Sequence, residues 1–148
     1  MIRKYFANKD NTITNAFDAG LTTRGTGSNM GAADILETFS IYGQVSNSSG
    51  LSAEKSRIII QFPIYKITND RASGVVPASG NVDFYLNLYN ARHSKTLPRE
   101  FYLSILPIRD EWQEGYGLDM ETYIDLTYDQ TGSNWIMAQG DTLWGATG

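Results

Sequence analysis

The sequence predicts an all-β fold built from antiparallel strands, and two observations support this prediction. The 148 residues include 9 Tyr, 6 Phe, 3 Trp and 14 Gly, a mixture typical of strands joined by turns. Apolar and polar residues alternate with a period of two in several segments, whereas no long segment shows the helical period of 3.6. We therefore expect packed β-sheets, with room for one short helical segment.

Apolar patterning places five strands along the chain. The first is a short alternation around Ile13. The third contains Ile58-Ile59-Ile60 followed by Phe62, and a run that is apolar on both faces indicates a central strand covered on both sides. The five expected strands are residues 11–15, 35–45, 57–64, 82–89 and 101–108.

The two later strands have the clearest alternation. In 82–89 the apolar series faces one side, while Asp83 and Asn87 face the other. Residues 101–108 alternate in the same way, which predicts for each strand one buried and one wet face. From these three strands the expected core residues are Ile58, Ile60, Phe62, Phe84, Leu86, Leu88, Leu103 and Ile105.

Turn-rich connectors separate the strands, and none is long enough to link two domains. A helical turn over residues 31–38 is expected, with Asn29 as its cap. We expect one β-sandwich domain over 1–148, with an N-terminal arm at 1–9. Residues 116–148 lack a strand period, and 135–138 read as either a helical turn or a short strand. The sandwich is therefore completed either by another chain or by residues beyond Gly148.

The composition excludes several classes of function. There is no cysteine and the formal net charge is −4, so disulfides, thiolate metal sites and cysteine nucleophiles are absent. A weakly acidic surface repels phosphate, which argues against nucleic acid and anionic membranes as partners. No apolar run matches a signal peptide or a membrane span, so synthesis in a cytosol is expected.

No catalytic constellation can be assembled. The one histidine, His93, lies in a polar stretch without a recognisable partner or nucleophile, and a solvent-facing loop position is the expected reading. The glycine-rich run 25–31 lacks the Lys-Ser/Thr of a phosphate-binding loop and is read as a turn. A glycan hydrolase or lyase using the late carboxylates has no assignable roles. We expect a protein that is not an enzyme and has no catalytic residue.

Carboxylates that gather late in the chain are the one candidate for a cofactor. Asp119, Glu121 and Asp125 could supply oxygen ligands to calcium, although their spacing matches no defined calcium loop. Solvated loop carboxylates are the favoured alternative. No other metal, and no organic cofactor, is expected.

The order of these features resembles DNRLRE-type jelly-roll domains of bacterial surface proteins. In sequence order, the matching pieces are Asp10–Thr14, Asn29-Met30-Gly31, Ile35–Ile41, Ser56–Phe62, Val82–Tyr89, Phe101–Ile108 and Trp112-Gln113-Glu114-Gly115. The resemblance implies a jelly-roll-type antiparallel β-sandwich. Trp112 is then expected at the edge of the core, and Glu114 is expected to tie the turn after it. The usual Thr-Trp-Asn run, closing strand and secretion signal of these domains are missing.

The chain also resembles a class of proteins that are not secreted through a signal peptide. The opening residues 1–12 and the run 25–31 look like segments of tailed-bacteriophage virion proteins. This implies a virion structural protein at the capsid surface (as in capsid decoration), the neck or the tail. It would be made in the host cytoplasm and would contact other virion proteins and copies of itself as a homo-oligomer. The alternative is a carbohydrate-binding module that uses exposed Tyr and Trp to recognise host surface glycans.

Overall fold

The computed structural model describes residues 2–17, 21–47, 50–94, 99–118 and 131–145, and for residues 42–52 it describes the backbone alone. By its internal contacts the chain divides into two compact units. One unit comprises Met1–Arg3 and Ile64–Arg109, and the other comprises Lys4–Pro63 and Asp110–Gly148. We call them the helical unit and the sheet unit and describe each by itself. One sandwich domain over 1–148 therefore stays a prediction.

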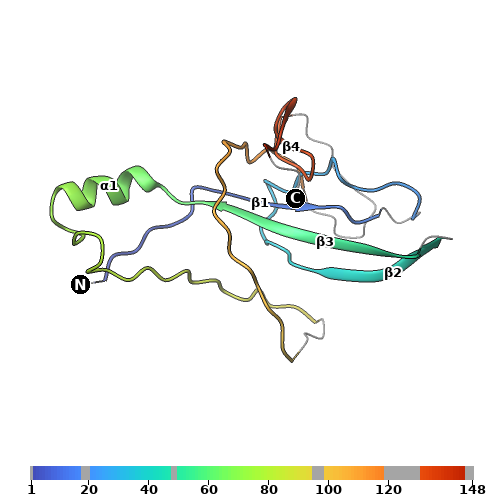
Figure 1. The fold of residues 1–148 in the computed structure, drawn as a ribbon, viewed down its shortest axis with the longest axis horizontal. Coiled ribbons are helices and arrows are strands. Elements are labelled where there is room, and N and C mark those ends of the chain that lie inside the picture. Colours follow the sequence, from blue (N-terminus) through green and yellow to red (C-terminus); the bar gives the residue numbers. More distant parts are fainter. Residues whose placement is uncertain (1, 18–20, 48–49, 95–98, 119–130, 146–148) are drawn as a thin grey trace. The chain divides into compact units, whose positions relative to one another are not determined.

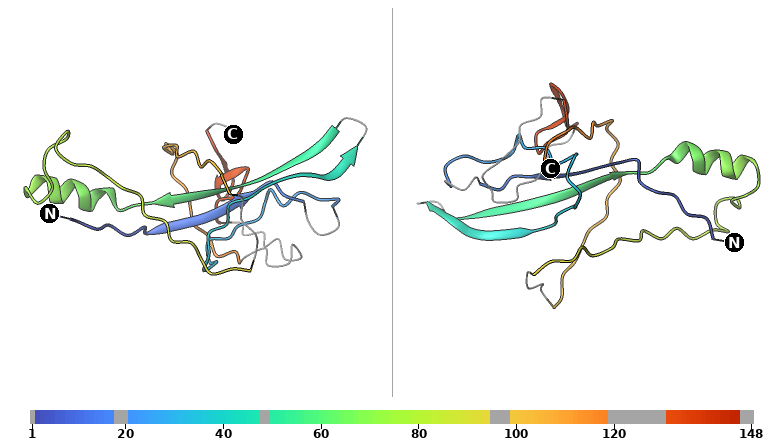
Figure 2. Two further views of the ribbon diagram at one scale, coloured as in Figure 1. Left: turned by 90° about the horizontal axis from the view of Figure 1, so that it is seen from below. Right: turned by 180° about the vertical axis from the view of Figure 1, so that it is seen from behind.

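The sheet unit is built on three antiparallel strands in the order β1–β3–β2 (Figure 1). These are β1 (Lys9–Thr14), β2 (Ser40–Asn47) and the long central β3 (Gly50–Gln61). The strands lie side by side in all views (Figure 2). The pairing of β2 with β3 shifts register between Tyr42 and Ser46, an irregularity of the β-bulge type. The predicted β-rich, antiparallel character is confirmed, whereas a two-sheet jelly roll stays a prediction.

Within the isoleucine run of β3, the buried residue is not one of the two predicted. Ile59 is 6% exposed, whereas Ile58, Ile60 and Phe62 are only partly buried. Neighbouring strand residues point to opposite faces, and Ile59 lies on the face that Trp112 covers. The run is therefore covered mainly on one face and not equally on both.

Two small clusters form the core of the sheet unit. In the first, Ile13 of β1 and Ile59 of β3 pack with Trp112 and Ala138, and the partly buried Trp135 and Trp144 lie against them. In the second, Ala16 and Met30 pack with Ala33 and Phe39. Segments from both ends of the sequence thus share one core.

A short hairpin lies in the C-terminal region that was expected to be irregular. Strand β4 (Met137–Gln139) pairs antiparallel with β5 (Thr142–Leu143). Gly140 takes a positive φ of 47° in the turn, a conformation that glycine adopts without steric cost. This settles the open choice over residues 135–138 in favour of a short strand, which begins at Met137.

The helical unit contains the single helix of the described residues, α1 (Ile64–Ala72). The helical turn predicted over 31–38 is wrong, because that stretch forms turns and bends. At the end of α1, Gly74 has a φ of 76° and its N–H donates to the carbonyl of Arg71, as at many helix C-termini. No residue of α1 is buried, and its apolar pair Ile64 and Ile67 is too short a pattern to predict a helix from the sequence.

The residues after α1 run as extended chain without strand pairing. No described residue of 82–94 or 99–109 takes part in a β-bridge, and the ribbon carries no arrow there (Figure 1). The prediction that this region supplies core residues is wrong: the exposed ones are Phe84, Leu86, Leu88, Leu103 and Ile105. Alternation indicates that one face of a segment is to be buried, but it does not show which segment or chain buries it. The described residues of this unit form no second layer over these segments.

Candidate functional site

His93 is exposed, and the described residues contain no group of three or more His, Cys, Asp or Glu arranged to hold a metal ion. The calcium candidates Asp119, Glu121 and Asp125 lie outside the described residues. Among the helices of the described residues, none has the length and apolar character needed to cross a membrane.

Among the described residues, the most elaborate polar arrangement lies in the sheet unit. It is formed by the buried Asn11, Asn29 and Ser133 with the partly buried Glu114, and we call it the asparagine node. At its centre is Asn29, which is fully buried. Its Nδ2 donates to the carbonyl oxygens of Glu114 at 2.6 Å and Ser133 at 2.7 Å. Its Oδ1 accepts from the N–H groups of Gly31 at 3.1 Å and Gly117 at 2.9 Å. An amide side chain has two donors and two acceptor positions, so all four are used.

The second amide of the node extends it into the sheet. Asn11 of β1 is also fully buried. Its Nδ2 donates to both the carbonyl and the hydroxyl of Ser133, at 3.0 and 2.9 Å. Its Oδ1 accepts from the N–H of Met30 at 2.9 Å. Asn11 and Asn29 thus join β1, the glycine-rich run and two C-terminal segments.

Glycines let the backbone approach the node closely. A Cβ placed on Gly31 would overlap the backbone of Glu114, and one on Gly117 would overlap the backbone of Asn29. A Cβ on Gly132 would meet the Asn29 side chain. The glycine-rich run 25–31 contains turns, as predicted from its composition. Its Gly31 also allows the run to pack closely against the backbone of Glu114. Asn29 was expected to cap a helical turn, but no helix follows it among the described residues 31–38.

Chemically the node is a structural device. Both amides are buried, and their hydrogen bonds go to backbone and side-chain groups of the chain itself, so they join segments of the sheet unit. Sequence reasoning singled out Asn29 and Glu114 but missed Asn11 and Ser133. Asn11 carried a signal, since an amide beside Ile13 in a short strand must find partners if it is buried.

The motif residues Trp112 and Glu114 both contact the start of β1. Trp112 is 5% exposed and lies in the core. The Lys9 Nζ donates to its carbonyl at 3.0 Å and stands 5.7 Å from its ring centroid. The Glu114 Oε1 accepts from the backbone N–H of Asp10 at 2.8 Å. This hydrogen bond ties β1, whereas the expected role of Glu114 was to tie the turn after it.

The Asp10 carboxyl has a raised pKa, because burial disfavours its charged form and the negative charge of Glu114 adds to that effect. The folded state therefore holds this proton more tightly than the unfolded state, whose pKa is near 3.8. Stability from this group is greatest below 3.8 and is lost as pH rises through the raised folded pKa.

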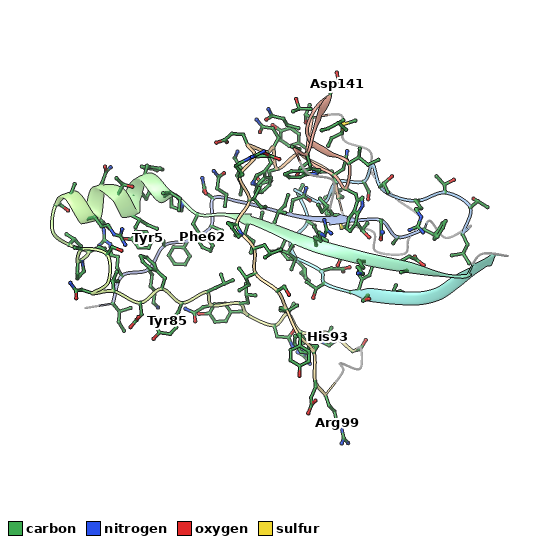
Figure 3. All side chains as sticks on the ribbon, viewed as in Figure 1. Tyr5, Phe62, Tyr85, His93, Arg99 and Asp141 are labelled. Carbon is green, nitrogen blue, oxygen red and sulfur yellow. The ribbon has the colours of Figure 1, made fainter. Side chains whose placement is uncertain are left out.

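We expect Asp10→Asn to increase the free energy of unfolding at neutral pH, because it removes this unfavourable charge. Urea titrations of both proteins at neutral pH and well below 3.8 measure the effect, which should disappear in acid. Asp141→Asn, which neutralises an exposed carboxylate near β5 (Figure 3), controls for net charge. Equal stabilisation by the two variants would contradict the local origin of the effect.

The tryptophan rings serve packing more than ligand contact. Trp135 and Trp144 are partly buried against the core. The Arg57 guanidinium lies 4.4 Å from the Trp135 ring centroid, and the Trp144 Nε1 donates to the carbonyl of Asn134 at 2.8 Å. The aromatic rings most open to solvent are tyrosines, namely Tyr85, Tyr89, Tyr102 and Tyr116.

A large exposed apolar surface lies on the helical unit. We call residues 82–89 the first extended segment and residues 101–108 the second. Their large hydrophobic side chains are 42–95% exposed: Phe84, Tyr85, Leu86, Leu88, Tyr89, Phe101, Tyr102, Leu103, Ile105, Leu106 and Ile108. Tyr85 projects from the extended chain (Figure 3). Asp83 is the single charged residue of the two segments. This surface is the strongest candidate for an interaction site.

The sequence matches no protein family model, no curated protein and no solved structure. The resemblance to DNRLRE-type domains thus depends on the motif residues alone and stays a proposal. The two notable features of the chain are the asparagine node of the sheet unit and the exposed apolar side chains of the helical unit.

Proposed function

We propose that this chain is a structural protein of a tailed-bacteriophage particle, a component of the capsid surface, neck or tail that acts through protein–protein contacts. The observation that carries the proposal is the apolar surface of the two extended segments. Exposed apolar side chains that gather on one part of a protein often mark a protein–protein interaction site. Eleven large hydrophobic side chains, all at least 42% exposed, therefore favour a partner that covers them.

The chemistry of the described residues supports assembly over catalysis. The buried polar groups of the asparagine node are hydrogen-bonded to one another, and the one histidine lies exposed on the helical unit. Apolar residues and few charges are typical of the centre of a protein interface. The resemblance of residues 1–12 and 25–31 to virion proteins supports a phage particle as the place of assembly.

Composition of purified particles tests the proposal. Phage released from a host that carries this gene is purified through a density gradient, and its proteins are quantified by mass spectrometry. We expect this chain in a constant ratio to the major capsid protein, in repeated copies, after washing in high salt. Recovery of the chain from the lysate alone, with none in the particles, would refute the virion assignment.

The exposed tyrosines favour one alternative, a module that binds host surface glycans, because aromatic faces stack on sugar rings. Tyr116 is the candidate in the sheet unit, with 82% of its surface exposed. If the alternative holds, Tyr116→Ala should reduce binding to a glycan array of host surface polysaccharides at least tenfold and leave the unfolding midpoint nearly unchanged. Absence of binding by the wild-type protein to every such glycan would eliminate the alternative.

A further inference from the structure

We infer that the first extended segment pairs antiparallel with the same segment of a second copy of this chain, so that two copies build one β-ladder. The inference deepens the proposed function, since it names the partner of the apolar surface. It requires that the surface serve protein–protein contact, but it does not require that the contact occur in a phage particle.

The helical unit cannot cover this surface by itself. Among its described residues Val76 alone is buried, at 6% exposure, and α1 buries none. A unit as small as this one, which comprises Met1–Arg3 and Ile64–Arg109, needs a core or a partner to hold one conformation. The ion pair of Arg3 with Asp70 and the stacking of Arg71 on Phe84 at 5.8 Å are exposed or partly exposed contacts. Such contacts contribute little to stability.

The first extended segment has the properties of an unpaired strand. It has a period of two, it contains no proline, and none of its residues forms a β-bridge. Each of its residues therefore has a backbone N–H and C=O that a ladder would satisfy. The second extended segment is less suited to pairing, because Pro107 has no N–H to donate.

The sequence of the first extended segment is complementary to itself. An antiparallel pair centred on Tyr85 places Phe84 opposite Leu86 of the partner subunit. The same register places Val82 opposite Leu88 of the partner subunit, so the apolar residues of both copies share one face. Asp83 then faces Asn87 of the partner subunit, and the two carboxylates do not oppose each other. This register therefore keeps the apolar residues of both copies on one face and keeps the two Asp83 carboxylates apart.

The pair brings exposed hydrophobic side chains of both copies onto one face. Phe84, Leu86 and Leu88 are 58%, 42% and 55% exposed in the single chain, and in this register each lies opposite an apolar residue of the second copy.

Engineered cysteines test the pairing, since the chain contains no cysteine of its own. Residues directly opposite in an antiparallel ladder have Cα atoms about 4.5–5.5 Å apart, within the range that a disulfide spans. Tyr85→Cys places two cysteines opposite each other at the centre of the pair. Asn87→Cys, on the same face, places them four ladder positions apart, at roughly 13 Å, and is the matched control.

We expect the wild-type chain to sediment as a dimer or larger multiple. We also expect Y85C to form a covalent dimer at least tenfold faster than N87C under mild oxidation. Phe84→Asp should shift the sedimentation of the full chain toward the monomer while the far-ultraviolet spectrum of the sheet is retained. A wild-type monomer at micromolar concentration, or equal cross-linking of Y85C and N87C, would overturn the inference.

The two proposals can fail separately. A dimer with the expected cross-link but no copies in purified particles would refute the virion assignment and support the pairing. A monomer in solution that is nevertheless incorporated in particles would support the virion assignment and refute the pairing.

Discussion

Trp112→Ala is expected to lower the free energy of unfolding by about 3–5 kcal/mol, the range for removing a buried tryptophan from a core. The ring is 5% exposed and packs with Ile13, Ile59 and Ala138, so its removal leaves a cavity between β1, β3 and the C-terminal hairpin. The Lys9 Nζ also loses the ring beneath it. Urea denaturation followed by circular dichroism measures the change.

Tyr116→Ala is the matched control, because it also truncates a large aromatic side chain but one that is 82% exposed. Its cost should be below about 1 kcal/mol, as for most surface substitutions. A Trp112 variant no less stable than the Tyr116 variant would show that the ring lies outside the core in solution.

Asn29→Ala is expected to cost roughly 3–5 kcal/mol, because it leaves several buried groups without partners at about 1–3 kcal/mol each. The groups are the carbonyl oxygen of Glu114 and the N–H groups of Gly31 and Gly117, whereas the carbonyl of Ser133 still accepts from the Asn11 amide. Asn29→Asp has the same shape but no Nδ2 donor. It should be at least as damaging at neutral pH, since a carboxylate oxygen then faces two carbonyl oxygens.

Asn8→Ala serves as the control for the node, since Asn8 is exposed and its backbone N–H, which the substitution keeps, donates to the carbonyl of Gln61. Its unfolding midpoint should stay close to that of the wild type. If Asn29→Asp unfolds at the same urea concentration as the wild type, the hydrogen bonds of the node do not exist as described.

Local patterns in the sequence were sufficient for the early part of the sheet. A short alternation around Ile13 and the apolar run Ile58-Ile59-Ile60 predicted strands where β1 and β3 lie. Periodicity is a local property that follows from backbone geometry, which is why it can be read without the fold. The same reasoning missed α1, because a helix of 9 residues is too short for a helical period to be recognised in the sequence.

Burial could not be read in the same way, because it depends on which segments meet. The glycine-rich run and the Trp112–Gly115 motif each indicated a place where the chain packs closely against another segment. Neither showed that Asn11 and Ser133 complete one hydrogen-bonded cluster with Asn29, since these residues are separated by as much as 122 positions.

The sequence by itself determined that this chain is β-rich, lacks cysteine chemistry and carries segments in which apolar and polar residues alternate. Only the tertiary structure decided that Ile59 and Trp112 form a core while the apolar residues of 82–89 and 101–108 remain exposed. The physical reason is that a period of two indicates that one face of a segment is to be buried, but another segment or another chain has to bury it. Whether the surface belongs to the same chain or to another copy is a property of the assembly and not of the pattern.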